Sequence, residues 1–152
     1  MSTKEEIEKR GIFIPGEVPS SKNSKEIGYI FLKRGTPGKI FVERNGNFLP
    51  VRLNLLHSKT TQRYIKEHSI DYIANKVKFQ RIASGYSAPF RICFKFTRGS
   101  RRKFDYINAA QIVQDLMVEH GWIPDDNCDE AKPYFLDYEY DKNNPGVLIS
   151  IF

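Results

Sequence analysis

One amphipathic segment in the second half of the chain constrains the fold most. Between Asp105 and Gly121 the apolar residues recur at intervals of three and four, at Ala109, Ile112, Val113, Leu116 and Met117. Asp105 stands at the position of an N-cap, and His120-Gly121 is a typical glycine C-cap signal. The pattern therefore predicts an α-helix of about 15 residues with its apolar side on the core.

Polar residues follow a second line along the same segment. Asn108, Gln111 and Asp115 recur at spacings of three and four, and Asp125-Asp126 follow Pro124 beyond the helix. Each acid has an ordinary structural explanation, as an N-cap at Asp105, an exposed helix position at Asp115, and turn residues at 125–126. An N-cap carboxylate still keeps one oxygen for another partner.

A short turn after the helix can bring the next segment back antiparallel to it, so the spacing permits Asp105 and Asp126 to converge without requiring it. If they converge, hard carboxylate oxygens would hold Mg²⁺ or Mn²⁺, which activates water and stabilises charge at a phosphodiester. Two cysteines without a CxxC or His/Cys spacing predict free thiols, so any metal must be held by oxygen.

The rest of the chain predicts a single domain over residues 1–152. We expect a first strand in 11–19, three short β-runs divided by turns in 29–56, a strand in 88–97, and two strands around an Asn-Asn-Pro-Gly turn in 132–152. A long helix is predicted over 58–82, with Ser58 as N-cap and an apolar stripe at helical spacing comprising Tyr64, Ile65, Ile70, Ile73 and Val77.

The charge distribution favours a polyanionic partner. The chain has 24 Lys and Arg against 18 Asp and Glu, a formal charge of +6. Five cations crowd into the stretch just before Asp105, namely Lys95, Arg98, Arg101, Arg102 and Lys103. Such a run is either a solvated loop or a phosphate-contacting rim beside the acids. The charged N-terminus has no apolar export signal, so we expect a cytoplasmic protein without a membrane span.

The stretch "FDYIN...QIVQDLMVEHGWIPDDN" resembles the signature of the RusA-type Holliday junction resolvases. In that family an Asp-x-Asp-Asn motif opens a helix that contains a further Asp, and Gly and then Asp-Asp follow at this spacing. The resemblance covers residues 98–127, and "VPSSKNS", with Lys22 and Asn23, is similar to a Pro-Ser-x-Asn element of the family.

The resemblance implies an α/β (α+β) fold with a small mixed sheet flanked by two main helices, and a homodimer. It also implies Mg²⁺-dependent cleavage of four-way DNA junctions in recombination and repair. By this match Asp105 and Asp126 are catalytic, with Asn108 and Asp115 at the other matching positions. A dimer suits a junction because a twofold enzyme can place one site on each of two equivalent strands.

Two positions depart from the family pattern. Ile107 replaces the second acid of the motif, and Gln111 replaces the helix Lys that better-known members use near the scissile phosphate. Asp125, Asp115 or Asn108 are candidates to substitute for the missing acid, and Lys103 or Lys132 to supply the missing charge.

Three hypotheses follow. The first is a metal-dependent structure-selective endonuclease, and the second is a junction-binding protein with little or no cleavage. The third is a general basic nucleic-acid-binding domain whose acids are only caps and turns.

Overall fold

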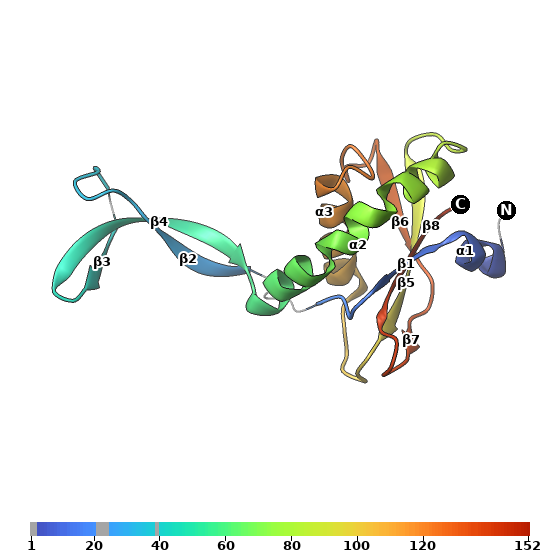
Figure 1. Ribbon diagram of the computed structural model, residues 1–152, viewed down its shortest axis with the longest axis horizontal. Coiled ribbons are helices and arrows are strands. Elements are labelled where there is room, and N and C mark those ends of the chain that lie inside the picture. Colours follow the sequence, from blue (N-terminus) through green and yellow to red (C-terminus); the bar gives the residue numbers. More distant parts are fainter. Residues whose placement is uncertain (1–2, 21–24, 39) are drawn as a thin grey trace.

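The computed structural model describes residues 3–20, 25–38 and 40–152. This part of the chain forms three helices, a mixed sheet and a smaller antiparallel sheet (Figure 1). The mixed sheet and the helices make a compact body, and the smaller sheet projects from it as an arm. The predicted class, a mixed sheet with helices, is confirmed.

The main sheet is organised around its central strand, β5 (Phe90–Arg98). β8 (Gly146–Ile151) pairs with one edge of β5 in antiparallel orientation, and β1 (Ile12–Pro15) continues the sheet beyond β8. The other edge of β5 pairs in parallel with β6 (Ala131–Phe135) and, further along, with β7 (Glu139–Tyr140). The parallel pairing arises because a helix connects β5 to β6.

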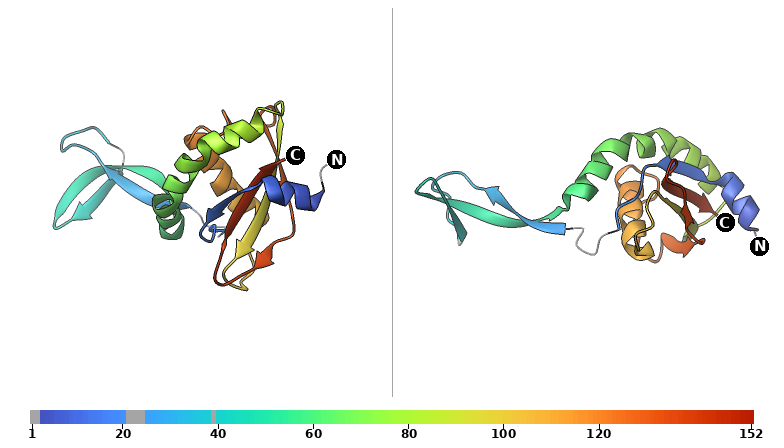
Figure 2. Two further views of the ribbon diagram at one scale, coloured as in Figure 1. Left: turned by 45° about the vertical axis from the view of Figure 1, so that its right-hand side comes forward. Right: turned by 90° about the horizontal axis from the view of Figure 1, so that it is seen from below.

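Two helices, α2 (Lys59–Ala83) and α3 (Tyr106–Glu119), pack against one face of this sheet and enclose the core (Figure 2). Every second side chain of β5 points into it, and these are Ile92, Phe94 and Phe96, all fully buried. The short helix α1 (Lys4–Arg10), capped by Thr3, lies on the other side, where Lys95 of β5 reaches Glu8. No helix in the described ranges is long and apolar enough to cross a membrane.

Helix α2 has the predicted N-cap but buries a different side. Ser58 Oγ accepts a hydrogen bond from Thr61 N at 3.3 Å, which confirms the cap. The core-facing residues are Thr61, Tyr64, Tyr72 and Phe79, whereas Ile70, Ile73 and Val77 are 64%, 53% and 58% exposed. The predicted long helix is confirmed, but the residues of the predicted stripe beyond Ile65 stay exposed, because α2 carries apolar residues on two sides and the aromatic side packs on the sheet.

The arm consists of β2 (Lys25–Phe31), β3 (Ile40–Arg44) and β4 (Asn47–His57). The three predicted β-runs are confirmed, but their order is β2-β4-β3 and not that of the simple meander the sequence suggested. β4 pairs with β3 through its first half and with β2 through its second half. The β3–β4 turn uses Asn45 and Gly46, both with positive φ, as a two-residue hairpin requires.

The C-terminal segment differs from the predicted pair of strands. It forms three strands, and the two around the Asn-Asn-Pro-Gly turn, β7 and β8, pair with opposite edges of β5 instead of with each other. The local turn signal was correct, but the partner of each strand is the central strand, which comes from an earlier part of the chain.

Candidate functional site

The N-terminus of α3 is held by Asp105. Its Oδ1 accepts hydrogen bonds from the backbone N–H groups of Ile107 at 2.9 Å and Asn108 at 3.4 Å. The predicted N-cap is therefore confirmed. Both hydrogen bonds use the same oxygen, so the cap leaves Oδ2 of Asp105 for another partner.

Asp126 shares a pocket of about 270 Å³ with the N-terminal half of α3. The lining residues are Ile107, Ala110, Gln111 and Gln114 from α3, Asp126 from the following loop, and Pro133 and Phe135 from β6. Three positions of the sequence motif, 107, 111 and 126, thus meet around one cavity. Asp105 caps the same helix two residues before Ile107 but is not among the lining residues. That it shares a cavity with Asp126 stays a prediction.

Ile107 does not pack into the core. Its side chain is 70% exposed, on the first turn of α3 beside the pocket. Gln114, by contrast, is only 8% exposed and provides a buried amide in the lining. Sequence reasoning missed Gln114, although its spacing of seven from Ile107 and three from Gln111 places all three on one side of the helix.

Asp125 organises the turn that presents Asp126. Its Oδ1 accepts from Asp126 N and its Oδ2 from the Asn127 side-chain amide, both at 2.8 Å. These bonds, that from Asn127 first, lower the pKa of the Asp125 carboxyl below its ordinary value. The turn interpretation is confirmed for Asp125, and both of its oxygens are engaged there.

Among the described residues, the other candidate ligands on α3 do not extend the site at Asp126. Asn108 and Asp115 lie on α3 but are not among the residues lining the Asp126 pocket. Within the described ranges, no group of three or more Asp, Glu, His or Cys side chains is arranged to hold a metal ion. Magnesium usually keeps several waters and takes one or two protein carboxylates. The donor chemistry of Asp126 and of Asp105 Oδ2 fits that mode, whereas a site with three protein carboxylates does not fit.

The basic run before α3 divides into residues with different roles. Lys95 Nζ lies 2.9 Å from Glu8 and 2.7 Å from Glu139, so this cation is paired on the α1 side of the sheet. Arg98 is 6% exposed, and its Nη1 donates to the Val18 carbonyl at 2.6 Å. These two cations are engaged in holding the fold together.

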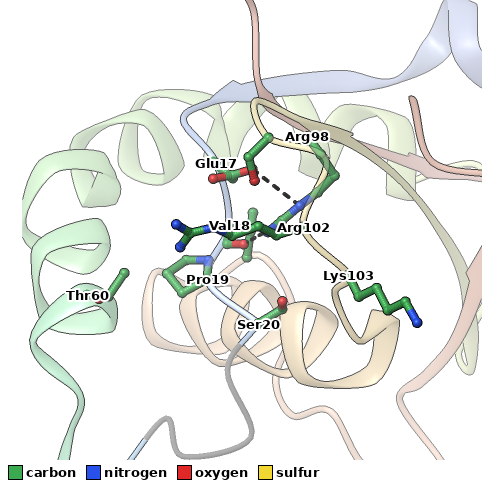
Figure 3. A pocket seen from close by; sticks show the side chains of 9 residues that line it. Glu17, Val18, Pro19, Ser20, Thr60, Arg98, Arg102 and Lys103 are labelled. Atoms are coloured by element: carbon green, nitrogen blue, oxygen red, sulfur yellow. Dashed lines mark hydrogen bonds and ion pairs between the residues drawn. The ribbon is translucent and has the colours of Figure 1, made fainter. Parts of the chain in front are cut away.

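Glu17 fixes the loop that carries the other cations. Its Oε1 lies 3.3 Å from Arg98 Nε and accepts a hydrogen bond from Gly99 N at 2.9 Å. Figure 3 shows Glu17 and Arg98 pointing toward each other. The ion pair anchors the start of the 98–103 loop to the segment after β1.

A second pocket, of about 460 Å³, opens beside this anchored loop. Its lining comprises Glu17, Val18, Pro19, Ser20, Thr60, Arg98, Ser100, Arg102 and Lys103. Arg102 and Lys103 are exposed, and Lys103 extends away from the Glu17–Arg98 pair (Figure 3). Exposed cations beside hydroxyl groups are suited to phosphate oxygens.

Ser20, Thr60 and Ser100 were not predicted as site residues. Ser20 lies within the family-like "VPSSKNS" segment, which was the available signal. Lys22 and Asn23, expected to contact DNA, lie outside the described residues.

Two further cations, Arg101 and Lys132, are not among the residues that line the Asp126 pocket. Arg101 stacks over the Tyr140 ring at 4.2 Å. Lys132 is the registered partner of Arg91 on β5, and its Nζ lies 5.4 Å from the Tyr134 ring centroid. Side chains alternate along a strand, so Lys132 points to the opposite face of the sheet from Pro133, which lines the Asp126 pocket. The sheet therefore separates Lys132 from Gln111, the position at which the resemblance expects a lysine.

Comparison of the chain with models of known protein families gave no match, and a search of curated proteins found no relative.

Proposed function

We propose that this protein is a Mg²⁺-dependent endonuclease of the RusA type that acts on branched DNA such as four-way junctions. The observation that carries the proposal is the pocket shared by Ile107, Gln111 and Asp126. These positions correspond to three functional positions of the resolvase motif, and the N-cap of the same helix, Asp105, corresponds to a fourth.

The pocket of about 460 Å³ that is lined by Arg102 and Lys103, here called the cationic pocket, supports a nucleic-acid partner. Only Phe104 separates Arg102 and Lys103 from Asp105 in the chain, so the phosphate-binding groups and the capping carboxylate belong to one short connection between β5 and α3. Phosphate contacts fix the position and register of a duplex. The loop would hold the backbone while the acids face the scissile bond.

In this proposal, Asp126 and Oδ2 of Asp105 hold the metal ion. A bound Mg²⁺ would supply a Lewis acid for the phosphodiester and lower the pKa of a coordinated water. Arg102 and Lys103 orient the flanking phosphates and offset their charge. Gln111 can donate a hydrogen bond where the resolvases have a Lys, but it brings no positive charge.

A second candidate function is junction binding with little cleavage. It is favoured by Ile107, which places an exposed alkyl side chain at the pocket where the resemblance expects a carboxylate. An alkyl group cannot ligand a cation, whereas the cationic pocket is independent of this replacement.

A cleavage assay on a mobile four-way junction separates the two candidates. The protein is incubated with the junction and with a linear duplex of one arm's sequence, in Mg²⁺ or EDTA. Symmetric nicks in the junction that disappear with EDTA and in Asp126→Asn support the nuclease. Selective junction binding without nicks, in both Mg²⁺ and Mn²⁺, supports the second candidate. Equal affinity for junction and duplex without cleavage would contradict both.

A further inference from the structure

Large apolar side chains are exposed on both faces of the arm. Tyr29 and Phe31 on β2 share one face with Leu53 on β4, because antiparallel partners project to the same side. Phe41 on β3 and Phe48 on β4 share the opposite face. These five side chains are between 47% and 72% exposed, and Phe48, two residues after the hairpin turn, is the most exposed of them.

The arm also carries cations on both faces. Over residues 28–38 and 40–57, one exposed acid, Glu43, stands against four exposed cations, namely Lys33, Arg34, Arg44 and Arg52. Arg44 lies on the first face, 5.5 Å from the centroid of the Phe31 ring. Arg52 projects from the other face, because side chains alternate along β4. Each face therefore combines aromatic rings with a positive charge.

The arm begins beside the cationic pocket. Ser20 and Thr60, which line that pocket, lie five residues before β2 and three residues after β4. Figures 1 and 2 show the ribbon extending beyond the N-terminal end of α2, away from the main sheet. A single polyanionic ligand can therefore contact the pocket and continue along the arm.

Unpaired nucleotides suit this surface better than paired ones. The faces of the bases are already stacked inside a duplex, but an unpaired base leaves its faces free for aromatic side chains. Arg and Lys side chains bind the phosphates between such bases. A single strand is also flexible enough to follow both faces of a ribbon, whereas the rigid surface of a folded partner would cover only one of them.

We propose that the arm binds an unpaired DNA strand that continues from the branch point, with bases stacked on its exposed rings and phosphates on its cations. The assignment to DNA rests on the proposed function and deepens it with a substrate class, namely branched DNA that has a single-stranded tail. β4, with 11 residues, spans about 36 Å, or about ten nucleotides at the 3.4 Å spacing of stacked bases. Junctions with a tail of this length should be preferred over fully paired ones.

Fluorescence anisotropy in EDTA tests the arm without any cleavage. The labelled probes are a fully paired four-way junction, the same junction with a dT10 tail on one arm, and the same junction with a U10 tail. We expect the dT10 tail to raise affinity by on the order of 10-fold, because stacking of bases on aromatic side chains contributes that much or more. The U10 tail should not bind more tightly than dT10.

Substitutions on the two faces separate base stacking from other apolar contacts. Phe48→Leu and Tyr29→Leu keep an apolar side chain but cannot stack on a base, so each should bring the ratio of tailed to paired affinity close to one. Phe48→Tyr and Tyr29→Phe keep the ring and are the matched controls, in which the ratio should persist. Circular dichroism melts verify that each variant is folded.

A shortened arm provides a second test. Phe31 and Val51 are registered partners, so Asn-Gly can replace residues 32–50 and close a shorter hairpin between them. This variant lacks the far half of the ribbon, including Phe41 and Phe48, and should likewise lose the preference for the tailed junction.

Three outcomes would overturn the proposal: equal affinity for tailed and paired junctions, a preference that both leucine variants retain, or a preference lost equally in the ring-keeping controls. Tighter binding of the U10 tail would overturn the assignment to DNA. Leucine variants that bind the tail normally but change in sedimentation would assign the arm to a protein contact instead. Because binding in EDTA needs no metal, a tail preference without any Mg²⁺-dependent cleavage would contradict the proposed nuclease alone.

Discussion

Ile107 and Asp126 line the same pocket, although one lies on the first turn of α3 and the other in the loop that follows this helix. Ile107 is 70% exposed, so its alkyl side chain contributes little to the core. The position can therefore be changed to a polar residue with a small effect on folding, which makes the pocket accessible to direct tests.

Ile107→Asp should restore the acid of the resolvase motif. Little apolar burial is lost at this exposed position, so we expect little change in melting temperature without metal and a rise with Mg²⁺. Binding to the native state adds about 3 kcal/mol when Mg²⁺ is 100 times its dissociation constant. Faster junction cleavage should accompany it. Ile107→Asn is the uncharged control. A lower melting temperature without any metal response would show that position 107 does not face a cation.

Asp126→Asn should abolish Mg²⁺-dependent cleavage and leave junction affinity equal or higher. The change removes a metal ligand and also a negative charge that repels phosphate. Gel-shift titrations beside the cleavage assay measure both effects, and Asp137→Asn, an exposed acid outside the pocket, is the control. Binding lost together with cleavage would mean that Asp126 has a structural role.

Two changes at Asp105 separate its cap from its charge. Asp105→Ala removes the acceptor for Ile107 N and Asn108 N and should cost about 1 kcal/mol of unfolding free energy. Asp105→Ser keeps a capping oxygen and should preserve stability, yet it removes the carboxylate and should also remove cleavage. Urea unfolding and the junction assay provide the two readouts. Full cleavage by the Ser variant would assign Asp105 to capping alone.

Changing Arg102 and Lys103 together to Ala should weaken binding to all DNA shapes. Each lost phosphate contact removes about one unit from the slope of log affinity against log salt, so the double variant should lose about two. Lys132→Ala is the control, because that side chain lies on the other face of the sheet and should leave the slope unchanged. A slope unaffected by the double change would mean that the loop is merely solvated.

The buried tyrosine pair predicts alkaline destabilisation. Burial raises the pKa of Tyr64, which is 4% exposed and bonded to Tyr72, to about 12. Below pH 10 the phenol is protonated in both states, so it does not affect stability. Between pH 10 and 12 only the unfolded state loses the proton, and stability falls by about 1 kcal/mol at pH 11 for this group.

Urea unfolding from pH 8 to 11.5 measures this slope. The double variant Tyr64→Phe/Tyr72→Phe should flatten it. An equal slope in this variant would show that other groups control the alkaline transition.

The sequence by itself determined the local elements that are bounded by strong signals. Asp105 and Gly121 bracket α3, Ser58 begins α2, and Asn45-Gly46 closes the β3–β4 hairpin. Caps and tight turns act over a few residues, so the local sequence contains all of the interactions that specify them. The motif positions around α3 were named from the resemblance of this stretch to the resolvase signature, and spacing alone only permitted them to converge.

Only the tertiary structure decided how these elements are used. It turned Tyr72 and Phe79 of α2 to the core instead of Ile70, Ile73 and Val77.

It also divided one basic run into paired, buried and exposed cations, because Glu8 and Glu17 come from distant segments. The meeting of Ile107 with Asp126 required β6 to pair beside β5 with α3 as the connection. The physical reason is the same in each case. Hydrogen bonds along the backbone specify an element locally, but burial and ion pairing depend on which distant surface covers it.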